Sequence, residues 1–309
     1  MWTAAALWIA TAAGAAVYVW VAERAVAAGS PSTPWVFGIV AIYFGIVLFM
    51  WSLYFSLAWF FRARRPREVR IGLRATVRLL WREYKALAFA APRMMFYGLL
   101  VRDPSPARVD VPVLLLHGVL CNAGVWARMS RFLKRCGIDG VYTLSYGPPL
   151  ASIEAFADQL AGKIERISKA TGARSVMVVS HSMGGLVVRA YMRKYGIARL
   201  ASVMTIGAPH HGSVHAWLLF GTSLAQLRPG NGWLAELNRV RLDPSLRFVS
   251  LWSWHDSMVA PQTSAELPGA HDVPVIGVGH NALLADAEVL ERTHAEIVGV
   301  RTEARRHAA

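Results

Sequence analysis

The chain has 309 residues, of which 55% are hydrophobic and only 17% are charged. This balance excludes intrinsic disorder, which needs low hydrophobicity and high charge. Two cysteines in a chain of this length also exclude a disulfide-stapled scaffold. Lys and Arg outnumber Asp and Glu by 33 to 19, a formal net charge of +14, and this apolar and basic composition points first to a membrane.

Two long uncharged runs open the chain, over residues 1–22 and 34–61. A bilayer core of about 30 Å needs about 20 apolar residues in a helix, so we expect two transmembrane helices, at about 2–22 and 35–61. One alternative is a cleaved signal peptide, with Ala25-Val26-Ala27 as the cleavage site. The first run lacks the positive start of such a peptide and exceeds its apolar length of about 7–15 residues. The other alternative is a pair of buried core helices, which are usually shorter and amphipathic.

An arginine cluster follows the second run. Residues 62–70 contain five Arg, whereas the link between the runs, 23–33, contains one Arg and one Glu. By the positive-inside rule, the end of the second run and everything after it lie in the cytoplasm. The sequence therefore predicts an integral membrane protein, in a bacterial inner membrane, whose catalytic domain is cytoplasmic. The two cysteines agree with a reducing compartment.

The segment 62–108 reads as a basic amphipathic link between membrane and domain. Arg70, Arg74, Arg78 and Arg82 recur every four residues, which predicts a helix with one cationic face. Such a helix next to a span can lie on anionic lipid, and we expect this contact through residues 62–93. Nucleic acid is not expected, because no nucleic-acid-binding motif accompanies the charge. The alternative also stays open that this arginine face lies in water and only determines the orientation of the spans in the membrane.

The remainder, residues 109–309, reads as one α/β domain. From Val111 onward, short Val/Ile/Leu runs alternate with amphipathic helical stretches. This alternation predicts a mostly parallel sheet with helices on both faces. The stretch 214–243 is helical and apolar between two strands, so we expect a cap insertion over the carboxyl end of the sheet. Open α/β sheets hold their sites at that end.

The strongest chemical signal is the segment Ser180-His181-Ser182-Met183-Gly184-Gly185 between a predicted strand and a predicted helix. A G-x-S-x-G nucleophile elbow needs this context, with small residues where strand and helix approach closely. Ser180 stands where the motif has its first glycine. We predict that Ser182 is a nucleophile. The alternative is an ordinary serine N-cap, which would not need the two glycines.

A serine nucleophile that attacks an acyl group also needs donors for the oxyanion. One donor is expected from the N–H of Met183, directly after the nucleophile. The other is expected from Val119, in the loop that follows an earlier strand and begins with His117 and Gly118. His117 itself is expected to brace this loop.

Two further strand ends supply a base and its orienting carboxylate. Asp256 follows the predicted strand 247–254, and His280 follows the predicted strand 273–279. They occur in the order Ser, Asp, His and at the same end of the strands as Ser182, which predicts a catalytic triad. No metal or organic cofactor is needed for this chemistry. Side chains expected along the substrate path are His117, Leu120, His181, His210, Trp217 and Phe220.

Several ordered motifs together resemble the α/β-hydrolase-fold lipases and esterases, in particular the bacterial triacylglycerol-lipase-like group. The resemblance covers roughly residues 111–285. It depends on the segments PVLLLHG, SHSMGG, TIGAPHHGS, QLRPGNGWLAELN, SWHDSMVAP and GVGHNALL. It implies the same triad and oxyanion hole, and it implies that the insertion after Gly212 acts as a lid. Some members hold a structural calcium ion, but no acidic cluster here supports one.

The predicted function is a membrane-anchored serine ester hydrolase that acts on acyl lipids. A thioesterase or acyltransferase on the same triad is the first alternative, because it would use the same acyl-enzyme. A non-catalytic membrane-binding protein of this fold is the second. A non-catalytic binding protein has no use for a complete set of Ser, Asp, His and oxyanion donors, so the set argues against this alternative. The fold alone would not decide between them.

Overall fold

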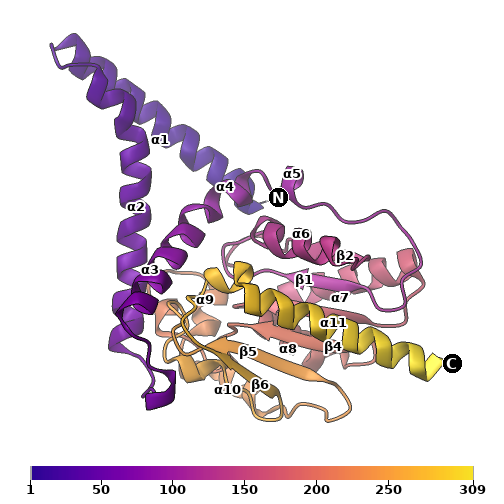
Figure 1. Cartoon of the computed structure of the whole chain (residues 1–309). Helices are drawn as coiled ribbons and strands as arrows, with labels where there is room; N and C mark the ends of the chain where they lie inside the picture. The colour runs from indigo at the N-terminus through magenta and orange to yellow at the C-terminus, as the bar shows by residue number, and fades with distance from the viewer. Residues whose placement is uncertain (1, 309) are drawn as a thin grey trace.

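The computed structural model describes residues 2–308, and its most conspicuous feature is an apolar helical hairpin that stands away from an α/β domain (Figure 1). Helix α1 (Trp2–Ala27) and helix α2 (Thr33–Phe60) form the two arms. Both are long and apolar enough to cross a membrane, by length and composition, and they are almost entirely unburied. The two uncharged runs are therefore helical, as predicted, and the first helix extends five residues beyond its uncharged run.

Short elements lead from the hairpin into the domain: η1 (Arg67–Val69), α3 (Leu73–Ala88), α4 (Ala90–Met95) and α5 (Tyr97–Leu100). The expected cationic stripe is wrong at its first residue. Arg70 has an extended backbone, with ψ 138°, and Gly72 remains extended before α3 begins. Glycine has a low helix propensity, and α3 begins only after Gly72. Of the four arginines in the expected stripe, only Arg74, Arg78 and Arg82 therefore lie on α3.

The predicted parallel sheet is confirmed, and it is parallel throughout its six described strands. The strand order is β2-β1-β3-β4-β5-β6. The strands are β1 (Val113–Leu116), β2 (Val141–Leu144), β3 (Val176–His181), β4 (Leu200–Ile206), β5 (Phe248–Ser253) and β6 (His271–Val275). The last strand differs from expectation, because it begins at His271 and ends before Ile276. His280 therefore lies in a loop several residues beyond the strand.

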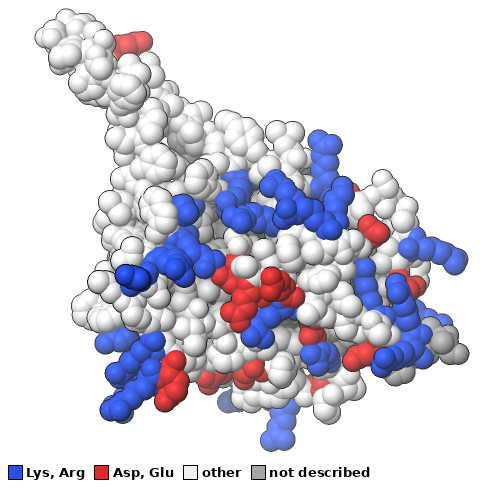
Figure 2. Space-filling model, viewed as in Figure 1, with Lys and Arg blue, Asp and Glu red and all other residues white. Residues whose placement is uncertain are grey.

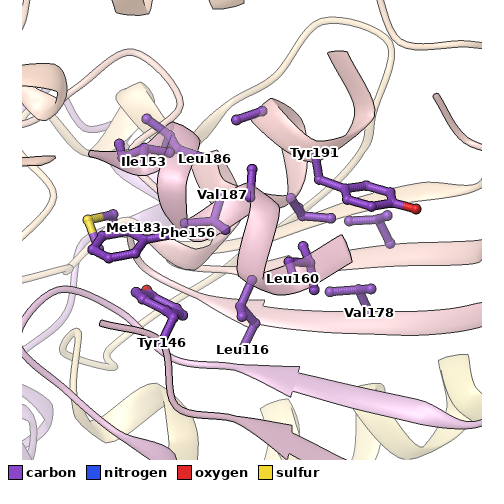
Figure 3. Close-up of a cluster of buried hydrophobic side chains, with 14 of the residues drawn as sticks. Leu116, Tyr146, Ile153, Phe156, Leu160, Val178, Met183, Leu186, Val187 and Tyr191 are labelled. Atoms are coloured by element: carbon purple, nitrogen blue, oxygen red, sulfur yellow. The ribbon is translucent and has the colours of Figure 1, made fainter. Parts of the chain in front are cut away.

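Helices cover both faces of the sheet because the buried strands alternate apolar side chains between the two faces. Leu114, Leu116 and Val178 face α7 (Ile153–Thr171) and α8 (Gly184–Tyr195), where Phe156, Leu160 and Leu186 complete one core (Figure 3). Leu115 and Val179 face the opposite way. There they pack with η2 (Ala123–Trp126), α6 (Ala127–Arg135), η5 (Ala282–Ala285) and α11 (Ala287–Ala308).

The cap insertion forms η3 (Val214–Trp217), α9 (Thr222–Leu227) and α10 (Gly232–Arg239), and η4 (Gln262–Ala265) follows after β5. Leu224, Leu227, Leu234 and Leu237 belong to the same core as α7 and α8. The cap is thus fastened to the domain by its helices. The segment between η3 and α9 differs, because Trp217 is 63% exposed and Phe220 is 88% exposed.

Candidate active site

Ser182 occupies a tight turn between β3 and α8. Its φ is +55°, a left-handed conformation that non-glycine residues rarely adopt and that is concentrated at functional sites. The surrounding glycines permit the turn. A Cβ at Gly184 would lie 2.6 Å from the carbonyl oxygen of His117, and a Cβ at Gly118 would lie 2.8 Å from the Cβ of Ser182. The small residues of the motif therefore allow three backbone segments to meet around one partly exposed serine.

Asp256 and His280 form a buried pair on the neighbouring loops. Nδ1 of His280 lies 2.8 Å from Oδ2 of Asp256. The other carboxylate oxygen, Oδ1, accepts hydrogen bonds from the N–H groups of Met258 and Val259, each at 2.7 Å. Three donors thus fix the carboxylate, and the carboxylate fixes one orientation of the imidazole ring, leaving Nε2 for other chemistry.

Strand register brings this pair to the same sheet edge as Ser182. The N–H of Ser182 donates to the carbonyl of Ile206, the last residue of β4, at 3.0 Å. A Cβ on the next residue, Gly207, would lie 3.2 Å from Oδ2 of Asp256 and 3.4 Å from Nδ1 of His280. Among the described residues, no hydrogen bond joins the Ser182 hydroxyl to His280. Such bonds often tighten only in the substrate complex.

The electrostatic surroundings of His280 favour its protonated form. Burial lowers the pKa of this imidazole, but the charge and hydrogen bond of Asp256, together with the charge of Glu83, outweigh burial. The net result is a pKa above the ordinary value of 6.5. A histidine whose pKa is raised by a carboxylate partner can accept a proton and later return it.

The loop after β1 has the features of an oxyanion site. Neither Val119 nor Met183 donates its N–H to an acceptor within residues 2–308, so both N–H groups are free for a ligand. Leu120 follows with a φ of +54°. His117 braces the loop: Nδ1 contacts the carbonyl of Gly118 at 2.8 Å, and Nε2 accepts from the N–H of Tyr146 at 3.2 Å. Burial lowers the pKa of His117 to about 4, which keeps it neutral.

The structure separates the other expected substrate-path residues into two groups. His181 and His210 are buried behind the site: Nε2 of His181 lies 3.2 Å from the carbonyl of His280, and Nε2 of His210 lies 3.2 Å from Oγ1 of Thr205. Nε2 of His181 and Nε2 of His210, like both ring nitrogens of His117, therefore have hydrogen-bond partners in the protein itself. Leu120, Trp217 and Phe220 are exposed at the surface.

Parts of the chain are similar to known proteins. A PGAP1-like alpha/beta domain family matches residues 139–259. A triacylglycerol lipase of Pseudomonas fragi is 30% identical over 111 residues, 33% of this chain and 36% of the lipase. A lecithin-cholesterol acyltransferase-like 4 protein of Arabidopsis thaliana is 32% identical over 120 residues, 36% of this chain and 19% of the relative. The match thus spans little more than a third of the lipase and about a fifth of the Arabidopsis relative.

A solved structure of similar fold extends the comparison beyond the matched segments. The mature lipase BlEst2 of Bacillus licheniformis superposes with a TM-score of 0.52 at 19% identity, covering 59% of this chain and 90% of the lipase. The chain carries a domain of the α/β-hydrolase fold.

A buried glutamate that the sequence did not single out joins the α/β-hydrolase domain to the segment after the hairpin. Glu83, on α3, is 2% exposed. Its Oε1 accepts from the Ser257 hydroxyl at 2.8 Å and from the N–H and Nδ2 of Asn281, each at 2.9 Å. Its Oε2 accepts from the N–H of Ala282 at 2.8 Å. The two oxygens of Glu83 thus accept four hydrogen bonds, and among the described residues they donate none. This is the pattern of an ionised carboxylate.

These bonds hold the loop that carries His280, the candidate base. Asn281 and Ala282 follow His280 directly, and Ser257 follows Asp256. The Ser257 hydroxyl, while donating to Glu83, also accepts from the N–H of His280 at 3.4 Å. The sequence contained one signal, an acidic residue in a stretch rich in arginine, but only the fold reveals its target.

Gln262 connects the chain just after α2 to the same loops. The N–H of Ala63 donates to Oε1 of Gln262 at 3.1 Å, and Nε2 of that buried glutamine donates to the carbonyl of Asp256 at 3.1 Å. Two successive hydrogen bonds through Gln262 therefore connect the chain that leaves the hairpin to the backbone of Asp256, the candidate orienting carboxylate.

Proposed function

We propose that the protein is a membrane-anchored serine carboxylic-ester hydrolase that cleaves acyl esters of lipids. The observation that carries this proposal is the 2.8 Å contact between His280 and Asp256 at the sheet edge where Ser182 sits in a left-handed turn. Similarity to triacylglycerol lipases over a third of the chain supports ester hydrolysis as the reaction class.

The proposed mechanism assigns one role to each group. Ser182 Oγ attacks the ester carbonyl while His280 Nε2 takes its proton, and Asp256 stabilises the imidazolium. The free N–H groups of Val119 and Met183 meet the oxyanion, each such donor contributing about 3–4 kcal/mol to the transition state. His280 then protonates the leaving alcohol, and water, activated by the same histidine, resolves the acyl-enzyme.

Contacts at both ends of the hairpin support delivery of the substrate from a bilayer. Near the start of α1, the Thr3 hydroxyl donates to the carbonyl of Cys121, two residues after Val119, at 3.0 Å. Toward the end of α2, the carbonyl of Tyr54 lies 3.1 Å from Nε2 of His215 in the cap. The exposed Trp217 follows His215 on η3. Apolar helices thus meet the domain beside the oxyanion loop and beside exposed apolar cap residues, as a lipid substrate requires.

The test of function is hydrolysis of p-nitrophenyl esters of increasing chain length by the full-length protein in nonionic detergent. We expect release of p-nitrophenol and labelling of Ser182 by a fluorophosphonate probe. A preference for long acyl chains would identify a lipase, and a preference for short chains an esterase. Neither hydrolysis nor labelling, from protein with a cooperative melting transition, would contradict the proposal.

Acyl transfer is the second candidate, because one relative bears the name of a lecithin-cholesterol acyltransferase-like protein. It would use the same acyl-enzyme and differ only in the group that resolves it, an alcohol in place of water. Product analysis with an acyl lipid, with and without an added long-chain alcohol, separates the two. A free fatty acid that persists when the alcohol is present indicates hydrolysis.

The pH profile is expected to follow the raised pKa of His280. This imidazole must be neutral to accept the serine proton, so kcat/KM should fall on the acidic side through a pKa above 6.5. The ionisable groups facing it are Asp256, Glu83, His181 and His215, and burial lowers the pKa of both of these histidines. Initial rates on a soluble ester between pH 5 and 9 measure the limb, and a limb below pH 6.5 would contradict this assignment.

The membrane arrangement follows from the charge distribution. Figure 2 shows a protruding hairpin almost free of charged side chains, with Lys and Arg gathered where it meets the domain. We propose that α1 and α2 span a bacterial inner membrane, that residues 62–93 lie on its anionic cytoplasmic surface, and that the catalytic domain is cytoplasmic.

The topology is testable with reporters fused after Ala309. A green fluorescent protein fusion should fluoresce, and an alkaline phosphatase fusion should be inactive, while carbonate extraction should leave the protein in the membrane pellet. An active phosphatase fusion would place the domain outside the cytoplasm. Release by carbonate would contradict the anchor.

A further inference from the structure

A cavity of about 970 Å³ lies between the end of α2, the link to α3, and the loop after β5. Four arginines line it: Arg62, Arg64, Arg65 and Arg70. None of the four forms an ion pair within residues 2–308. Arg62 lies over the Trp59 ring, with 3.8 Å from its guanidinium carbon to the ring centroid. A cluster of like charges without counter-charges raises the free energy of the fold unless an anion joins it.

Two hydrogen-bond donors at this cavity lack acceptors. His255 lines the cavity and is 3% exposed. Its Nδ1 accepts from the N–H of Gly277 at 3.2 Å, so in the neutral ring Nε2 carries the hydrogen, yet Nε2 has no partner among the described residues. Nε of Arg65 is likewise buried and without a partner there. Buried donors are nearly always satisfied, so two of them at one cavity indicate an absent acceptor.

Charge effects agree with this geometry. Burial and the charge of Arg65 lower the pKa of His255 to about 4, and burial and the charge of Arg62 lower the pKa of Arg65. An anion among them would oppose both shifts. The neighbouring carboxylate of Asp256 faces His280 and two backbone N–H groups, and no described hydrogen bond or ion pair joins it to Arg65 or to the ring of His255.

We propose that this cavity is a binding site for a phosphate group, distinct from the acyl site, held by Arg65 and His255 with the other three arginines around it. Guanidinium groups bind phosphate oxygens in a bidentate way, and a neutral imidazole adds one N–H donor. The cavity borders Asp256, and neither Ser182 nor His280 is among its lining residues.

Two sources could supply such a group, an anionic lipid headgroup or free phosphate. The apolar wall favours the lipid, because Phe55 and Trp59 come from the last turns of α2 and Leu79 comes from α3. A headgroup among the arginines would leave its acyl chains beside the apolar helix. This choice of source depends on the proposed membrane anchor, whereas the phosphate site itself does not.

Binding is tested by isothermal titration calorimetry on the full chain in nonionic detergent, in a Ser182→Ala background so that no probe is hydrolysed. The probes are dihexanoyl phosphatidic acid, dihexanoyl phosphatidylcholine and inorganic phosphate. We expect phosphatidic acid to bind at least about tenfold more tightly than phosphatidylcholine. Arg65→Gln should weaken it at least about tenfold. Arg305→Gln removes the same charge from an exposed position on α11 and should leave binding unchanged.

The outcomes separate the sources. Phosphate that binds as tightly as phosphatidic acid, and is weakened equally by Arg65→Gln, identifies a site for free phosphate. Equal affinity for the two lipids, or equal effects of Arg65→Gln and Arg305→Gln, overturns the proposal. If Arg65→Gln does not fold, the lipid comparison on the parent protein still decides. Since the readout is binding, failure of ester hydrolysis would not be mistaken for failure of this site.

Discussion

Replacing Ser182 with alanine is expected to lower kcat for ester hydrolysis by about 10⁴–10⁶-fold. Alanine removes the oxygen that would attack the ester, while the backbone N–H groups of Val119 and Met183 remain to polarise the carbonyl. Residual activity above the uncatalysed rate would come from this oxyanion site. The left-handed turn also remains, so a small change in stability is expected.

Ser202→Ala provides the matched control. Ser202 is fully buried on β4, toward the amino end of the sheet, and its hydroxyl donates to the carbonyl of Arg247 at 3.1 Å. It should retain the parent kcat within a few-fold. Rates of the two variants and the parent, normalised to folded protein by melting curves, make the comparison. Comparable losses in both variants would show that Ser182 is structural and not the nucleophile.

Much of the fold could be predicted from the sequence, because its signals are local. The runs around Leu115 and Val178 are continuous and apolar, as strands covered on both faces must be. The parallel order then brings the ends of β3, β4 and β5 to one edge, which is why the sequence could predict that Ser182 and Asp256 lie at the same end of the sheet. The errors were local too, since Gly72 delays α3 and β6 ends before the loop that carries His280.

The contacts that hold the site together could not be predicted, because they join residues far apart in the chain. Glu83 lies 174 residues from Ser257 and 198 from Asn281. Periodicity marks α3 as an amphipathic helix but does not say which loop its acidic residue meets. Likewise, His117 and His210 are histidines, as is the candidate base His280. Only their buried hydrogen bonds assign them to bracing the protein.

Replacing Glu83 with glutamine is expected to lower kcat by about 10–100-fold and to shift the acidic limb of the pH profile to lower pH. Glutamine keeps the size of the side chain but loses the charge. Its amide NH₂, itself a donor, would face the N–H and O–H donors that now bind the carboxylate. Hydrogen bonds to a charged group contribute about 1.5–3 kcal/mol, and each 1.36 kcal/mol corresponds to a tenfold change in rate. The loop around His280 would lose its fixed position while Ser182 stays intact.

The pH shift distinguishes positioning from simple stability. Burial lowers the pKa of His280, and the charges of Asp256 and Glu83 raise it. Removing the second charge should therefore lower the pKa, so that the base becomes neutral at a lower pH. Glu83→Asp keeps the charge and should keep the limb near that of the parent, even if its shorter side chain costs activity.

Glu68→Gln is the control for charge near the membrane, because Glu68 is an exposed carboxylate just before α3. It should leave both kcat and the limb unchanged. If Glu83→Gln lost activity only in proportion to its folded fraction, with the limb unmoved, Glu83 would be a structural residue. If the limb moves, α3 is part of the catalytic machinery. The segment that joins the apolar hairpin to the domain would then also set the protonation of the triad base.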